Sequence, residues 1–338
     1  MSFPAKMKTL SALAVASLTA ASFVQPCAAK TDYSKRLVIA GEAGGGIDHV
    51  AIVDAEGNPL WEYPTRAIHD LHLLENGNLL FQTSWTRIVE MTLKKEIVWS
   101  YDASKMNGNE GKRVEVHAFQ RLPNGNTMIV ESGPARILEV DRVGRVEKEI
   151  KLKTDKPNAH SDTRLARKLE NGHYLVSHEA DGVVREYDGE GKIVWEFDVP
   201  MFGKEAKPGH GPEAFGDSTF APLKRKNGNY LISTGNGHSV LEVSPEKEIV
   251  WKLEQNDLDG VTLGWVTTLQ ELPDGNLVVG NCHATKENPQ IIEVTPDKKI
   301  AWKFHDWEHF GNNMPNSLVI DGKAAEALLK RIHEEAGV

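Results

Sequence analysis

Short apolar runs alternate with polar turns along most of this chain, and one arrangement of them recurs. An apolar run ends in Asn-Gly or Asp-Gly and a second apolar run follows at once, as in HDLHLLENGNLLF at 69–81 and TTLQELPDGNLVV at 267–279. The same arrangement returns at 117–130, 164–176 and 220–232. Two apolar runs joined by such a dipeptide are typical of a β-hairpin, so the pattern predicts a hairpin at each place.

The hairpin turns are evenly spaced. Their first residues lie 48, 47, 56 and 47 positions apart, at Asn76, Asn124, Asn171, Asn227 and Asp274. A further step of 47 reaches Asp321-Gly322. Repeats of this length made of short strands indicate a β-propeller, an all-β fold in which each repeat forms one four-stranded blade.

The last strand of most repeats carries a Trp at a fixed place. It is seen in PLWEY (59–63), IVWEF (193–197), IVWKL (249–253) and IAWKF (300–304), whereas the third blade has VEKEIKL instead. A large ring at this position can pack against the neighbouring blade and bury apolar area in a ring-shaped core.

The two ends of the repeat region complement each other. The last turn leads into a helical pattern at 323–336, and the segment 36–42 has no hairpin partner before it. We therefore expect 315–320 to supply the inner strand of the blade that contains 36–42, 48–54 and 58–63. This terminal (velcro) closure makes six blades in one propeller domain, 30–338, and leaves no exposed sheet edge.

The first twenty-nine residues have the form of a signal peptide. Lys6 and Lys8 precede an uncharged apolar stretch, and small residues follow Cys27; Met7 is an alternative start. The stretch is short for a membrane span, so the sequence predicts an exported protein, periplasmic or extracellular, with no membrane span. If Cys27 is removed with this segment, Cys282 remains as a lone thiol.

The net charge of the chain argues against one class of partner. The whole chain has a net charge of −9, and residues 1–29 contribute two lysines and no acid, so the remainder carries −11. An acidic balance argues against nucleic-acid binding, which depends on Lys and Arg at the phosphates.

Histidines collect on one predicted face of the propeller. His69, His117 and Arg164 occupy the same repeat position, seven residues before the turn, where the inner strands approach the axis. Two imidazoles and a guanidinium around an axial funnel make a candidate site for a small or anionic ligand. Further candidates in the loops and inner strands of this face are Asp70, His160, His210, His283 and His305. The nine-residue excess at 199–220 is a candidate lid.

A resemblance to a known family implies a reaction for this funnel. The segments HAFQRLPNGNTMIVESGPARILEVD and IHDLHLLENGN resemble the repeats of bacterial arylsulfotransferases, and YDGEGKIVWEF is similar to the tryptophan-docking repeat of PQQ-like propellers. The resemblance spans 36–322. It implies sulfuryl transfer between phenols through a histidine nucleophile, aided by further histidines and an arginine. The positions that fit are His117 and His69 as catalytic residues, with His160, Arg164 and His283 in support.

Three other interpretations remain open at the level of the sequence. The same face could present a non-catalytic surface to a protein or glycan partner. No cofactor is expected, but Zn²⁺ or Cu²⁺ could be bound by the histidines with Asp70, Asp162 or Asp306. The glycine run 44–46 lacks the Lys-Ser/Thr ending of a phosphate-binding loop and favours an ordinary loop. A transferase requires the histidines to converge at the axis, whereas a scaffold does not.

Overall fold

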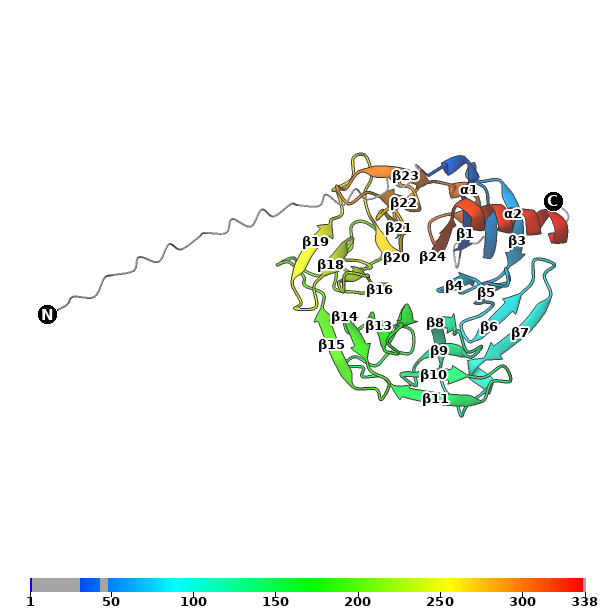
Figure 1. Ribbon diagram of the computed structural model, residues 1–338, viewed down its shortest axis with the longest axis horizontal. Helices are drawn as coiled ribbons and strands as arrows, with labels where there is room; N and C mark the ends of the chain where they lie inside the picture. Colours follow the sequence, from blue (N-terminus) through cyan, green and yellow to red (C-terminus); the bar gives the residue numbers. More distant parts are fainter. Residues whose placement is uncertain (2–30, 43–47, 337–338) are drawn as a thin grey trace. The chain divides into compact units, whose positions relative to one another are not determined.

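The computed structural model describes residues 1, 31–42 and 48–336. Between residues 31 and 336, twenty-four strands form six four-stranded antiparallel sheets, arranged as blades around a ring (Figure 1). The predicted six-bladed propeller is therefore confirmed. The predicted signal peptide, 1–29, and the glycine run 44–46 lie outside the described residues.

Each blade runs from an inner strand at the axis to an outer strand at the rim (Figure 1). The inner strands are β24 (Asn316–Ile320), β4 (Leu71–Leu73), β8 (Glu115–Arg121), β12 (Ala166–Lys168), β16 (Pro222–Lys224) and β20 (Trp265–Glu271). The second strands are β1 (Leu37–Glu42), β5 (Leu79–Gln82), β9 (Thr127–Ser132), β13 (Tyr174–His178), β17 (Tyr230–Ser233) and β21 (Leu277–Cys282).

The two outer layers complete the sheets. The third strands are β2 (His49–Val53), β6 (Arg87–Met91), β10 (Arg136–Val140), β14 (Val183–Tyr187), β18 (Val240–Val243) and β22 (Ile291–Val294). The outer strands are β3 (Pro59–Pro64), β7 (Ile97–Asp102), β11 (Val146–Lys151), β15 (Ile193–Asp198), β19 (Ile249–Leu253) and β23 (Ile300–Phe304). The helices are η1 (Tyr33–Lys35), η2 (Ala103–Lys105), α1 (Trp307–Phe310) and α2 (Gly322–Ala336).

The outer-strand tryptophans join neighbouring blades, as the sequence pattern predicts. Four of the five outer-strand indoles donate their N–H to a backbone carbonyl in a turn of the next blade, which meets the hydrogen-bonding need of the ring. The bonds run from Trp61 to Leu93 (2.8 Å), Trp99 to Arg142 (3.0 Å), Trp195 to Pro245 (3.1 Å) and Trp251 to Pro296 (3.1 Å).

The ring closes through the first and last strands of the propeller. β24 pairs with β1 in antiparallel register, from Leu37 opposite Ile320 to Gly41 opposite Asn316. β1 thereby has a partner on both sides, and this sheet has four strands like the others. The predicted closure is confirmed, with strand bounds within two residues of those expected.

A buried arginine fixes this closure. The guanidinium of Arg36 donates to Asp321 at 2.8 and 2.7 Å and to Glu293 at 2.6 Å, and it lies 4.5 Å from the ring centroid of Trp302. Asp321 directly follows β24, and Glu293 belongs to β22 of the adjacent blade. Arg36 therefore ties the start of the propeller chain to its end and to the last complete blade.

The terminal helix packs against the closed ring. Leu328 and Ile332 of α2 are buried and Leu329 is partly buried, in a cluster that includes Trp61 and Leu93. Its apolar stripe thus covers the junction of the first two blades. Among the described residues no helix has the length and apolar character needed to cross a membrane.

Replacing Arg36 by Ala is expected to lower the free energy of unfolding by about 3–5 kcal/mol, because the buried Glu293 carboxylate loses its cation. The adjacent Lys35 is a matched control, since its ion pair with Glu326 is exposed at 3.4 Å. Lys35→Ala should cost about 0–1 kcal/mol. Urea unfolding compares the two, and equal losses would contradict the role of Arg36 in closure.

Candidate functional site

One mouth of the axial channel is a cavity of about 710 Å³. Its wall combines titratable and aromatic side chains from inner strands, from the loops that precede them and from the loops between second and third strands. These include His69, Trp85, His160, Arg164, His210, Phe220, Trp265, Thr267 and His283. The predicted convergence of histidines on one face of the ring is therefore present.

Four residues at the repeat position seven before the turn line this cavity, namely His69, Arg164, Phe220 and Thr267. His117 occupies the same position in its blade but is fully buried next to His69. The rings of His69 and His117 have centroids 4.9 Å apart, and Phe220 stacks on His69 at 6.2 Å. Equivalent positions of separate blades thus meet because all inner strands approach one axis.

His69 has fewer polar contacts than its neighbour His117. It is 9% exposed, and within the described part of the chain its buried Nδ1 has no hydrogen-bond partner. Burial lowers the pKa of His69 well below its ordinary value, and the positive charges of His117, Arg164 and His160 act in the same direction. The ring is therefore held in its neutral form.

His117 has a different environment, because both of its ring nitrogens have polar neighbours. Nδ1 lies 2.8 Å from the carbonyl of Thr163, and Nε2 lies 3.2 Å from Oε2 of Glu115. Burial, followed by the charge of Arg164, lowers the pKa of His117 to about 4. The strand pairing of β8 skips His117, which marks a β-bulge, a device that redirects side chains near functional sites.

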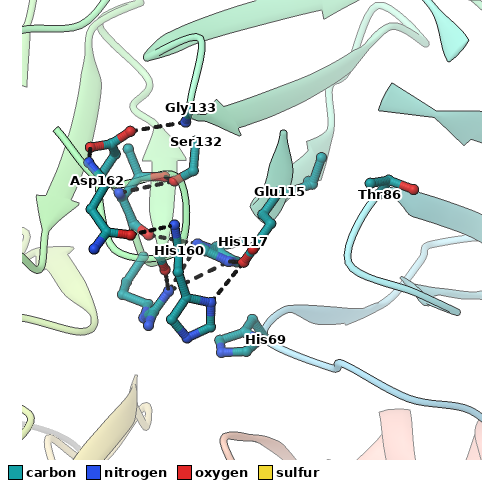
Figure 2. A network of polar contacts seen from close by, with 12 residues as sticks. His69, Thr86, Glu115, His117, Ser132, Gly133, His160 and Asp162 are labelled. Carbon is teal, nitrogen blue, oxygen red and sulfur yellow. Dashed lines mark hydrogen bonds and ion pairs between the residues drawn. The ribbon is translucent and has the colours of Figure 1, made fainter. Parts of the chain in front are cut away.

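Glu115 links His117 to the mouth of the cavity (Figure 2). The same Oε2 lies 2.7 Å from Nδ1 of His160, whose side chain is 47% exposed. Burial raises the pKa of Glu115, but the hydrogen bonds with His117 and His160 outweigh it and lower the pKa below the ordinary value. Glu115 is thus a carboxylate placed between two imidazoles.

Arg164 brings a cation to the floor of the cavity. It forms an ion pair with the buried Glu179, and its Nη1 lies 3.0 Å from Nδ1 of His117 and donates to the carbonyl of His160. Burial raises the pKa of Glu179, although Arg164 opposes that shift. The pair keeps the guanidinium next to the imidazoles.

Trp85 covers this polar group from the solvent side. The indole is 37% exposed and lies 4.9 Å from the ring of His69, 5.8 Å from His117 and 5.2 Å from His160, measured between centroids. It is an aromatic surface on which a planar ligand group could stack.

The opposite wall is a second cluster of imidazole and indole rings. His210 lies 4.6 Å from Trp265 and 5.1 Å from His283, centroid to centroid. Burial lowers the pKa of His283 to about 4 and also lowers that of His210. Cys282 lies beside them with its Sγ 3.5 Å from Oδ1 of Asn313, and burial raises the pKa of its thiol.

The predicted lid segment, 199–220, supplies His210 to this wall. Its backbone is anchored by a bridge between Lys207 and Phe215 and by a hydrogen bond from Gln255 to the carbonyl of Pro212. The segment thus forms part of the wall of the cavity. That it opens and closes stays a prediction.

Two predicted site residues lie elsewhere. Asp70 is fully buried one residue beyond His69, where it accepts two hydrogen bonds from Arg167 at 2.7 and 2.8 Å. Arg167 and His72 line the second mouth of the channel, so the Asp70–Arg167 pair lies between the two mouths. His305 is exposed and does not line the cavity.

The two other carboxylates that were candidate metal ligands, those of Asp162 and Asp306, already have hydrogen-bond partners. Asp162 accepts from the backbone N–H of Gly133 at 2.9 Å and from that of Asn158. Asp306 caps α1 and lies 2.7 Å from Nδ1 of His309. His309 belongs to this short helix.

Sequence reasoning missed Glu115 and Glu179. Glu115 precedes His117 by two residues, the spacing that places side chains on one side of a strand. The bulge at His117 breaks that alternation, so the spacing alone gave no firm contact. Glu179 follows β13 with no distinguishing pattern. Phe220 and Thr267 had a usable signal, since they share the repeat position of His69.

No family model matches this chain, and no curated protein matches its sequence. Among solved structures, it is similar to a protein of unknown function from Bacteroides caccae, with 23% identity and a TM-score of 0.69 over 84% of this chain and 98% of that one.

Two lyases also share the architecture. A catalytically inactive His-to-Ala virginiamycin B lyase from Staphylococcus aureus, solved with quinupristin, has 14% identity and a TM-score of 0.52 over 81% of this chain and 86% of that one. A streptogramin B lyase has 11% identity and a TM-score of 0.53 over 84% and 93%. At these identities the likeness shows the fold alone.

Lowering the pH should weaken the ion pair between Asp70 and Arg167, which lies between the two mouths of the channel. Burial raises the pKa of Asp70, but Arg167 and His72 outweigh it and lower the pKa from 3.8 to about 2. Because the folded pKa is the lower one, the stabilisation is complete above about pH 4 and is lost as pH falls through about 2. Asp70→Asn should cost about 2 kcal/mol at pH 7 and progressively less in acid.

The measurement is urea unfolding at a series of pH values. Asp198→Asn, at the exposed end of β15, is the control and should have little effect at any pH. A destabilisation by Asp70→Asn that stays constant down to pH 2 would contradict the ion-pair account.

Proposed function

We propose that the cavity is the active site of an arylsulfotransferase-like enzyme, with His69 as the nucleophile. The observation that carries the proposal is an imidazole with an unpartnered ring nitrogen, held against Trp85 and near Arg164 at the floor of the cavity. His117 is less suited to this role, because both of its nitrogens already have polar neighbours.

The cavity has the parts that a small anionic aromatic ligand requires. Trp85 and Phe220 offer flat apolar surfaces on either side of His69. Arg164 offers a guanidinium, whose fork geometry suits the oxygens of a sulfuryl group. The chain as a whole has a net charge of −9, which repels anions. An anion therefore binds favourably only where a cation is held in place, and here the ion pair with Glu179 holds Arg164 in place.

The transfer proceeds in two steps. A ring nitrogen of His69 donates its lone pair to the sulfur of an aryl sulfate, and the sulfur–oxygen bond to the ring breaks with its electron pair on the aryl oxygen, which takes a proton from water. The hydroxyl oxygen of an acceptor phenol then attacks the sulfur of the sulfo-imidazole. The nitrogen–sulfur bond pair returns to His69, and the phenol proton passes to a neutral base.

His210 is the base that we assign to the second step. It is exposed on the opposite wall of the same cavity, and its lowered pKa keeps it neutral. The neighbouring folds lend limited support: the virginiamycin B lyase lost its activity on substitution of one histidine, so a propeller of this size can depend on a single imidazole.

Incubation with 4-nitrophenyl sulfate should add one sulfuryl group to the intact protein, as read by mass spectrometry after rapid acid quenching. His69→Ala should abolish the adduct and reduce 4-nitrophenol release by roughly three orders of magnitude. His305→Ala is the matched control, because that histidine is exposed and outside the cavity. An adduct that persists in His69→Ala would reassign the nucleophile.

The absence of both adduct and nitrophenol release would overturn the transferase proposal. The cavity would then be that of a binding protein, and the partner a protein or a glycan. Circular dichroism of each variant separates loss of chemistry from loss of fold.

We also propose that the protein is exported and acts outside the cytoplasm. The support is the sequence of residues 1–29, with Lys6 and Lys8 before an apolar stretch and small residues at its end. N-terminal sequencing of the protein from a periplasmic or culture fraction should begin near residue 30. Recovery of the intact N-terminus from the cytosolic fraction would contradict export.

A further inference from the structure

Three side chains beside the cavity direct ligand atoms at a common point, and one of them, His160, lines the cavity. Glu115 and His117 belong to β8, and His160 lies in the loop before β12. One carboxylate oxygen and two ring nitrogens all lie within 4.8 Å of one another. Figure 2 shows the three groups facing each other, with His69 beside them but outside the contacts.

Nδ1 of His117 has two polar neighbours, the carbonyl oxygen of Thr163 at 2.8 Å and Nη1 of Arg164 at 3.0 Å. When Nδ1 donates to the carbonyl, Nε2 bears the lone pair of the neutral ring. That lone pair then faces the carboxylate oxygen of Glu115 at 3.2 Å, and a cation between the two acceptors makes the arrangement favourable.

The contact between Nδ1 of His117 and the carbonyl of Thr163 is one that metal-binding histidines commonly make. Metal-binding histidines commonly donate their second N–H to a backbone carbonyl, which sets the tautomer and the ring orientation. Glu115 is supported in a similar way, because its other oxygen lies 3.4 Å from the guanidinium of Arg113. Its Oε2 is thereby left to face His117 and His160.

We propose that Glu115, His117 and His160 bind a divalent transition-metal ion, with Zn²⁺ as the ion best suited to two imidazoles and one carboxylate. Ligand atoms of a tetrahedral zinc site lie about 2.0–2.2 Å from the ion and hence about 3.4 Å apart. The contacts of Glu115 at 2.7 and 3.2 Å need only a small outward movement, mainly of the half-exposed His160.

The surroundings make the ligand set rigid and leave it accessible. Trp85 packs edge-on against His117 and His160, which limits rotation of both rings. Arg164 would repel a cation, and its ion pair with Glu179 offsets that repulsion. Three protein ligands leave a fourth position for water or a substrate oxygen, the arrangement of catalytic rather than structural zinc sites.

The inference goes beyond sulfuryl transfer and does not depend on it. A metal beside Arg164 would create a site for an anionic oxygen whether or not His69 is a nucleophile. His117 would then serve as a ligand, and the catalytic assignment would rest on His69 alone.

The test is calorimetric titration of the untagged, chelator-treated chain with Zn²⁺. We expect one site in the wild-type protein, weakened in His160→Asn and Glu115→Gln by more than the roughly 10–100-fold that follows loss of a supporting partner. His160 is half exposed, so its replacement should leave the fold intact, as circular dichroism would verify. Titration with Co²⁺ should give visible absorption bands that the same substitutions remove.

The chain offers a closely matched control in His309→Asn. His309 and His160 are each 47% exposed, and each lies 2.7 Å from a carboxylate oxygen, but only His160 has a third ligand beside it. Zinc affinity should be unchanged in His309→Asn. Binding that is absent in the wild-type chain, or that is equal in His160→Asn and wild type, would overturn the proposal, whatever the outcome with 4-nitrophenyl sulfate.

Discussion

This propeller closes because the two ends of its chain meet in one sheet, through the pairing of β24 with β1 beside the buried guanidinium of Arg36. Open sheets of this length would expose two strand edges and the apolar faces between blades. Once the ring is closed, tryptophan contacts from blade to blade hold its circumference constant. The inner strands then have no freedom to move away from the axis.

The cavity is a consequence of that constraint. Equivalent positions of the repeats are brought together at the axis, so a polar residue placed there in one blade contacts those placed there in the others. The residue type at this repeat position differs around the ring. His69, His117 and Arg164 stand on one side, and Phe220 and Thr267 on the other. The result is a cavity with a cationic, hydrogen-bonding wall and an aromatic wall.

Buried polar groups that have hydrogen-bond partners and buried polar groups that lack them lie at different levels along the axis. Between the two mouths, the buried carboxylate of Asp70 accepts two hydrogen bonds from the partly exposed guanidinium of Arg167. One residue away, Nδ1 of His69 is buried without a partner, as is Oγ1 of Thr267 at the equivalent position, among the residues described. Buried polar atoms are rarely left unpaired, and where they are, a ligand or a catalytic role is a common reason.

The sequence by itself determined the number of blades, their order, the closing strand and the terminal helix. These follow from local signals, namely turn dipeptides at even spacing and a tryptophan in five of the six outer strands, which report on backbone geometry. It also indicated that His69, His117 and Arg164 would share a level of the axis. Only the tertiary structure decided that Glu115 meets His160, that Asp70 is taken by Arg167 and that His305 lies outside. Those contacts depend on a bulge, on loop paths and on residues 45 and 97 positions apart, which no local pattern encodes.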